Sequence, residues 1–194
     1  MFKIYLTALL AIILVGLNGC LNEEQAVMLA SKKGIDLQSK QQQHIVYQLP
    51  PQYQWKLGAQ TLQGINTTHV YIPVGESITH WTQSIGDYYF GNTSTRQLTV
   101  EQSINTQKSF LQQQCNMAEW TITKNSDSDI TYTTKVSDCH GADISAQLII
   151  SRTWQGKDGI YTLTYGAIPA IFTKSLKNLM ESTIRNASLQ DNNG

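Results

Sequence analysis

The feature that most constrains the fold of this 194-residue chain is a change in the spacing of its apolar residues near residue 100. Before this point, short apolar runs are bounded by Gly, Pro or Asn, which is typical of β-strands. After it, apolar and neutral residues recur every three or four positions, as on one face of a helix: Val100, Ile104, Gln107, Leu111 and Cys115. Thr99 and Gln102 have the spacing of a capping box, so the sequence predicts a helix of about four turns over 99–115.

The segments on either side of this helix predict an antiparallel sheet. Four strands are expected before it, at 44–49, 55–62, 69–74 and 81–90. Pro73 indicates an edge or the end of a strand. Four strands are expected after it, at 119–124, 130–136, 144–154 and 160–168. The turn clusters at 125–129 and 155–159 join them into two successive hairpins of a meander.

The last apolar stripe predicts a C-terminal amphipathic helix that lies across the sheet, formed by Ile171, Phe172, Leu176, Leu179, Met180, Ile184 and Ala187. The expected class is therefore α+β, in the order strands, helix, four-strand meander and C-terminal helix. This connectivity over residues 44–188 resembles the Mog1/PsbP-like fold of several bacterial envelope lipoproteins. The resemblance implies a binding or assembly protein and supplies no site residues. A cystatin-like or NTF2-like fold is the alternative.

The first twenty residues are typical of an export signal. A cation, Lys3, precedes an apolar run of about fourteen residues, which is shorter than a membrane span. Leu17-Asn18-Gly19-Cys20 resembles the lipobox of bacterial lipoproteins. The resemblance implies removal of residues 1–19 and acylation of Cys20, and Leu21 in place of Asp points to the outer membrane. More than one acyl chain holds a domain stably at a bilayer.

The domain organisation follows from this signal. Residues 20–43 are expected to form the lipidated N-terminus and a spacer with one short helix, because a polar, glutamine-rich stretch precedes His44. Residues 44–190 are expected to form one periplasmic domain, and residues 191–194 a frayed tail.

Cys115 and Cys139 remain once Cys20 is assigned to the lipid anchor, and an even pair in an oxidising compartment predicts a disulfide. Because Cys115 ends the first helix and Cys139 follows a meander strand, the bridge is expected to pin the helix to the sheet. A metal site or a catalytic thiol is the less favoured alternative, since two Cys and His140 without close spacing are poor zinc ligands.

No motif in the chain indicates an enzyme, a metal or a cofactor. Nucleophile elbows, zinc-binding helices and phosphate-binding loops are absent from the sequence. The lysine of Gly156-Lys157-Asp158-Gly159 lies in an expected hairpin turn, and 125–136 lacks the Gly and Glu of a calcium loop. Fourteen basic and fourteen acidic residues leave no excess positive charge for nucleic acid.

Aromatic residues at the strand ends give two alternatives. Trp81, Tyr88 and Trp154 either pack in the core, as Trp usually does, or form a contact patch for another envelope protein. The first hypothesis for function is a non-enzymatic outer-membrane lipoprotein whose periplasmic domain binds or scaffolds an envelope complex. The alternatives are a small-ligand carrier with a pocket between helix and sheet, and an envelope hydrolase or its inhibitor.

Overall fold

A computed structural model of the protein describes residues 41–93, 97–139 and 147–192. The expected signal peptide, Cys20 and the short spacer helix therefore lie outside the described residues. In the described ranges, no helix has the length and apolar character needed to cross a membrane.

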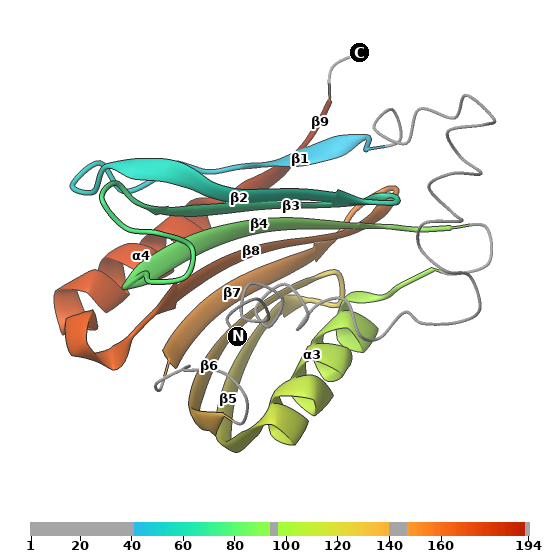
Figure 1. The fold of residues 1–194 in the computed structure, drawn as a ribbon. Coiled ribbons are helices and arrows are strands. Elements are labelled where there is room, and N and C mark those ends of the chain that lie inside the picture. The colour runs from blue at the N-terminus through green and yellow to red at the C-terminus, as the bar shows by residue number, and fades with distance from the viewer. Residues whose placement is uncertain (1–40, 94–96, 140–146, 193–194) are drawn as a thin grey trace, which may run out of the picture.

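The core of the structure is a seven-stranded antiparallel sheet in the order β2-β3-β4-β8-β7-β6-β5 (Figure 1). The strands have these bounds: β2 Trp55–Gln63, β3 Asn66–Pro73, β4 Gln83–Gly91, β5 Cys115–Ser126, β6 Asp129–Cys139, β7 Gln147–Gln155 and β8 Gly159–Ala167. The four strands after the helix form the expected meander, and the last of them pairs with β4. The antiparallel α+β prediction is confirmed.

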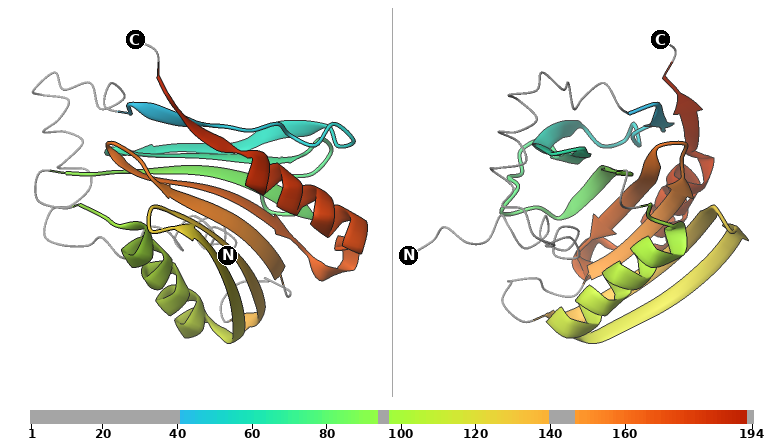
Figure 2. Two further views of the ribbon diagram at one scale, coloured as in Figure 1. Left: turned by 180° about the vertical axis from the view of Figure 1, so that it is seen from behind. Right: turned by 90° about the vertical axis from the view of Figure 1, so that its right-hand side faces the viewer.

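Two helices cover opposite faces of the sheet (Figures 1 and 2). Helix α3, Val100–Gln114, begins at Thr99 with the predicted capping box. Helix α4, Lys174–Asn186, begins at Thr173 after the short 3-10 helix η3, Pro169–Ile171. The C-terminal helix therefore starts later than its apolar stripe, because Pro169 stops the last strand and the chain turns before Thr173.

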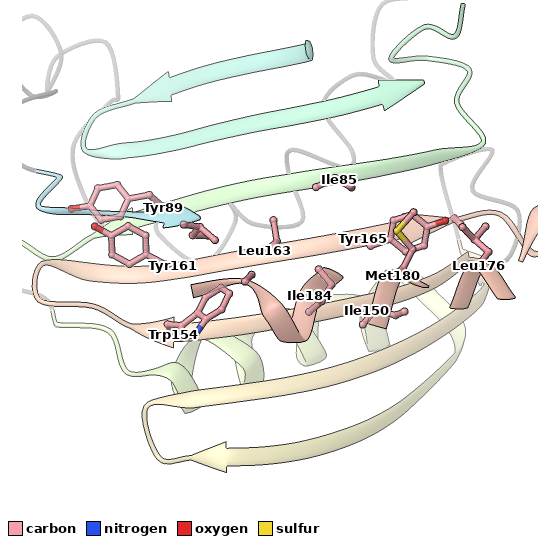
Figure 3. Close-up of a cluster of buried hydrophobic side chains, with 13 residues drawn as sticks. Ile85, Tyr89, Ile150, Trp154, Tyr161, Leu163, Tyr165, Leu176, Met180 and Ile184 are labelled. Carbon is pink, nitrogen blue, oxygen red and sulfur yellow. The ribbon is translucent and has the colours of Figure 1, made fainter. Parts of the chain in front are cut away.

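Apolar side chains point alternately to the two faces of the sheet along its central strands, so each face has its own hydrophobic core. On β4, Ile85 and Tyr89 pack with Met180 of α4, whereas Tyr88 and Phe90 pack with residues of α3. Figure 3 shows the larger cluster on the α4 face, in which side chains of β4, β7, β8 and α4 meet. Both faces of the sheet centre are therefore buried.

A second, two-stranded sheet joins the two ends of the described domain. Strand β1, Gln43–Val46, pairs antiparallel with β9, Ser188–Asp191, which follows α4. We call this pair the clasp. Its Ile45 is buried in the core on the α4 face.

The clasp changes two boundaries expected from the sequence. Gln43, assigned to the spacer, is the first residue of β1, and Asp191, assigned to a frayed tail, is the last residue of β9. Asn192 also donates its backbone N–H to Gln42 O over 2.7 Å. The short polar β9 is ordered by pairing with β1, which local sequence patterns do not reveal.

Cys115 and Cys139 form a disulfide, as predicted. The expected placement of the bridge is corrected: the two residues are direct register partners at the end of the β5–β6 hairpin. Because Cys115 is also the C-cap of α3, the bridge fixes the point where the helix turns into the sheet. It joins two neighbouring strands and does not cross from a helix to a separate strand.

Candidate functional site

The predicted aromatic contact patch is not assembled on the surface. Trp154 is buried on the α4 face, and Tyr88 is buried on the α3 face, where its ring folds over Gly86. Trp81 is half-buried, with its ring near Gly166. The core-packing alternative therefore holds for both residues, because Trp154 packs with residues of α4 and Tyr88 packs with residues of α3.

Exposed apolar side chains gather instead along the first edge of the large sheet. Leu57 and Leu62 of β2 keep 48% and 46% of their surface exposed, and Val74, just after β3, keeps 55%. In a regular strand, residues five apart face opposite sides. A β-bulge between Leu57 and Ala59 shifts the register by one residue, so both leucines face the α4 side, opposite Tyr71 and Thr67 of β3.

Strand β2 lies at the edge of the sheet and carries little charge. Strand β2 has a hydrogen-bonded neighbour on one side only within the described part of the chain. Proteins commonly protect such edges with charges, but Lys56 is the only charged residue of β2. We call Leu57, Leu62, Val74 and the free edge of β2 the edge surface.

The opposite edge, β5, provides a comparison. Its Ile122 keeps 50% of its surface exposed. Its sequence contains Glu119 and Lys124, and α3 leads directly into it. Strand β5 therefore has more charged residues than β2, in which Lys56 stands alone.

A buried polar network lies between α3 and the sheet. Tyr132 of β6 donates its hydroxyl to Gln107 of α3. On the same face, the hydroxyls of directly opposed residues of β7 and β8 pair at 3.0 Å, Ser151 with Thr164 and Thr153 with Thr162. The network contains only neutral groups, so it supplies hydrogen bonds without charge.

Two buried polar atoms beside this network have no hydrogen-bond partner among the described residues. Thr134, 1% exposed, leaves its Oγ1 unbonded, and Trp120, directly opposite it on β5, leaves its Nε1 unbonded. The Trp120 ring stacks on Tyr132, with centroids 5.3 Å apart. A buried donor without a partner is costly, so a water or a ligand oxygen would be favoured there.

Asp87 is a partly buried carboxyl in the middle of the sheet. It lies on β4, facing the α4 side, opposite His69 of β3 and Leu163 of β8. Burial raises the pKa of its carboxyl to about 6, and the positive charge of His44 on β1 acts in the opposite direction. Burial also lowers the pKa of His69. A carboxyl with a pKa near neutrality is typical of functional sites, although structural networks also produce such shifts.

Asp158, in the turn between β7 and β8, anchors the clasp to the large sheet. Its carboxylate accepts hydrogen bonds from the backbone N–H of Gln42 over 2.6 Å, from the Tyr89 hydroxyl over 3.1 Å and from the Tyr161 hydroxyl over 2.8 Å. The segment assigned from sequence to a simple hairpin turn is therefore also the docking point of β1.

The neighbouring residue, Lys157, makes two further links to the clasp. Its backbone N–H donates to Gln43 Oε1 over 2.7 Å, and its Nζ lies 2.6 Å from Asp191 Oδ2. Gln43 in turn donates to Asp191 over 3.0 Å. Both strands of the clasp are thus held by one turn of the large sheet.

The described residues contain no group of three or more His, Cys, Asp or Glu side chains arranged to hold a metal. His69 and Asp87 are register partners on the neighbouring strands β3 and β4. The only sequence signal was a carboxylate between Ile85 and Tyr89 in a strand that is otherwise without charge.

No protein-family model matches the chain, and no curated protein is significantly similar to it.

Proposed function

We propose that the protein is an outer-membrane lipoprotein, anchored through Cys20 on the periplasmic side, whose domain binds or scaffolds another envelope protein without catalysing a reaction. The anchor is supported by the lipobox-like sequence Leu17-Asn18-Gly19-Cys20. The disulfide between Cys115 and Cys139 is consistent with an oxidising compartment.

The observation that carries the binding role is the edge surface. Strand β2 has an unpaired edge within the described part of the chain, little charge and two exposed leucines. Such a strand is suited to accept an extended segment of a partner as an additional strand. In that mode, main-chain hydrogen bonds supply affinity, and apolar contacts such as those of Leu57 and Leu62 supply specificity. The aromatic patch is replaced in this proposal by the edge surface.

We further propose that the fold is of the Mog1/PsbP-like type. The support is the connectivity, in which a final helix packs across a meander and a second helix covers the other face. A cystatin-like or NTF2-like fold is the alternative.

The binding role is tested by photocrosslinking in intact cells that produce the protein. A photoreactive residue replaces Leu57, Leu62 or, as the matched control, Ile122 at the opposite edge. We expect the same partner to be captured from both β2 positions and not from Ile122. Capture should fall when Cys20→Ser removes the anchor. It should also fall when Leu62→Lys is combined with a photoreactive residue at position 57, because a lysine at a strand edge opposes strand pairing.

Equal capture from all three positions, or capture that is unchanged by Leu62→Lys, would contradict the proposed surface. Folding of each variant is checked by circular dichroism. If Leu62→Lys stays folded and keeps its partner, the edge surface is not the contact.

A small-ligand carrier is the second candidate, favoured by the unbonded Trp120 Nε1 and Thr134 Oγ1 beneath α3. A neutral ligand with hydroxyl or carbonyl groups would suit these atoms and the hydroxyl network. A thermal-shift screen of neutral small molecules tests this function. Thr134→Val, which keeps the side-chain shape, should abolish a stabilisation that depends on this site, whereas a shift that persists in the variant arises elsewhere.

A further inference from the structure

Strand β2, at the outer edge of the large sheet, has a symmetric pattern of side chains about Gln60 (Figure 1). Its register with β3 places Leu57, Gln60 and Leu62 on the α4 side, and all three residues are exposed. Gly58 is the extra residue of the bulge, so Leu57 lies two strand positions before Gln60, just as Leu62 lies two positions after it. The exposed apolar pattern therefore reads the same in both directions.

The residues on the other face of β2 follow the same symmetry. Ala59 and Thr61 lie one position on either side of Gln60, and both are small. Lys56 and Gln63 lie three positions on either side of it. Lys56 is the only charged residue of the strand, and Gln63 Oε1 has no hydrogen-bond partner among the described residues. A hydrogen-bond donor and an unpaired acceptor therefore occupy symmetry-equivalent places.

A strand with this pattern is complementary to an antiparallel copy of itself, related to it by a two-fold axis at Gln60. Leu57 of each copy then lies opposite Leu62 of the other, on the α4 side. Lys56 of each copy lies opposite Gln63 of the other, on the α3 side, and supplies a donor for the amide oxygen that is unpaired in one copy. In a strand without the bulge, residues five apart face opposite sides, and this match would fail.

Electrostatics also favour a second copy as the partner. In the antiparallel pair, the two Lys56 residues lie at opposite ends, about 20 Å apart along the strands. This separation exceeds the screening length of about 8 Å at physiological salt, so the two charges do not oppose pairing. The sequence contains fourteen basic and fourteen acidic residues, so two copies carry no net charge that would keep them apart.

We propose that the edge surface pairs with the edge surface of a second copy of this chain, through antiparallel β2 strands related by a two-fold axis at Gln60. The proposal rests on the edge surface of the proposed function and deepens it by naming the partner strand. The sheet then runs without interruption through seven strands of each copy. An axis perpendicular to the sheet keeps both α4 faces on one side. Both clasps, which pack on that face through Ile45, therefore lie on the same side, as two anchors in one membrane require.

Disulfide trapping of the purified full chain in detergent tests the pairing, because no other envelope protein is present. Gln60→Cys places two thiols across the axis, where the Cβ atoms of opposed residues lie about 4.5–5.5 Å apart, so we expect a disulfide-linked dimer. Leu57→Cys and Leu62→Cys should each remain unlinked alone and should link to each other when mixed. Ile122→Cys, exposed at the β5 edge, is the matched control and should not dimerise. The chain without an added cysteine is the blank.

A charge swap at the axis distinguishes pairing between copies from other contacts. Gln60 is exposed, so Gln60→Lys and Gln60→Glu should fold like the wild-type chain, as checked by circular dichroism. Each variant alone places two like charges opposite each other and should weaken dimerisation about tenfold or more, measured by sedimentation in density-matched detergent. An equal mixture of the two variants should restore the dimer, because opposite charges then face each other.

Three results would overturn the pairing of two copies: a monomeric wild-type chain, equal trapping at positions 60 and 122, or dimers that persist in both charged variants. The proposed function fails separately. If photocrosslinking in cells at Leu57 and Leu62 captures a different protein while the purified chain stays monomeric, the edge surface remains the contact and only the second copy is rejected. If neither experiment gives an adduct, both proposals are rejected.

Discussion

Arg152 on β7 makes the most connected ion pair of the described domain, and its replacement gives a large predicted loss of stability. Its Nε and Nη2 lie 2.9 and 2.7 Å from the two carboxylate oxygens of Asp129. Its Nη1 donates to the carbonyls of Arg185 and Ala187, at the end of α4, over 2.6 and 2.9 Å. The guanidinium also lies 4.8 Å from the ring centroid of Trp154.

We expect Arg152→Met to lower the free energy of unfolding by about 3 kcal/mol. The side chains of the pair are only 16% and 21% exposed, so the loss should approach that of a broken buried pair, about 3–5 kcal/mol, more than that of a surface pair. Methionine retains the apolar stem, so the change isolates the charge and its hydrogen bonds. Loss of the contacts to the last carbonyls of α4 adds to the effect.

Lys157→Met is the matched control. Its ion pair with Asp191 has side chains that are 58% and 54% exposed, so solvent screens it and its loss should cost much less than the loss of the Arg152–Asp129 pair. Urea unfolding of the full chain, followed by far-UV circular dichroism, measures both variants. A loss below about 1 kcal/mol for Arg152→Met, or one equal to that of Lys157→Met, would show that the Arg152–Asp129 pair contributes no more than a surface pair.

The pair also predicts a dependence on pH. Burial raises the pKa of Asp129, but hydrogen bonds from Arg152 and Asn125 outweigh it, so the net pKa lies below the ordinary value. A depressed folded pKa gives stability that is present above the unfolded pKa and is lost as the pH falls below about 4. This component should be reduced in Arg152→Met.

Three further predictions concern single features. Asp87→Asn should raise stability at pH 8 by up to about 3 kcal/mol, because wild-type stability is lost as the pH rises from about 4 to 6; equal stability of the two chains at pH 8 would contradict this. Replacing both Cys115 and Cys139 with Ala should cost about 3.5 kcal/mol in urea unfolding, since the bridge closes a loop of 24 residues; a cost below 1 kcal/mol would show that the bridge contributes little. Tyr132→Phe should cost about 1–2 kcal/mol in the same assay, because the Gln107 oxygen loses its buried donor, and an unchanged midpoint would show that the oxygen finds another.

Local patterns in the sequence predicted most of the elements. The capping box at Thr99 and Gln102 fixed the start of α3, and the turn at 125–129 placed the β5–β6 hairpin. These signals depend on neighbours along the chain, so they are readable without a structure. Pro73 likewise marked the end of β3.

Features that depend on distant pairing were missed. Strand β9 is polar and only four residues long, and it is ordered because β1 pairs with it. The edge surface was missed because the β-bulge after Leu57 reverses the alternation of side chains along β2. Leu57 and Leu62 therefore lie on the same face, whereas residues five apart in a regular strand lie on opposite faces. Asp87 and His69 come together only through the register of β3 and β4.

The aromatic residues show a related limit. Trp154 and Tyr88 are of residue types that are common in contact surfaces. Whether each side chain is buried depends on which face of its strand packs against the core. With both faces of the central strands covered by helices, no alternation pattern alone separates a core aromatic from an exposed one.

Tethering of the domain to the envelope through an acylated Cys20 is tested by mass spectrometry of the amino-terminal peptide, isolated from the membranes of cells that produce the protein. We expect a peptide that begins at Cys20 and carries a thioether-linked diacylglycerol. A peptide that retains Leu17, Asn18 and Gly19 before an unmodified Cys20 would exclude the lipid anchor.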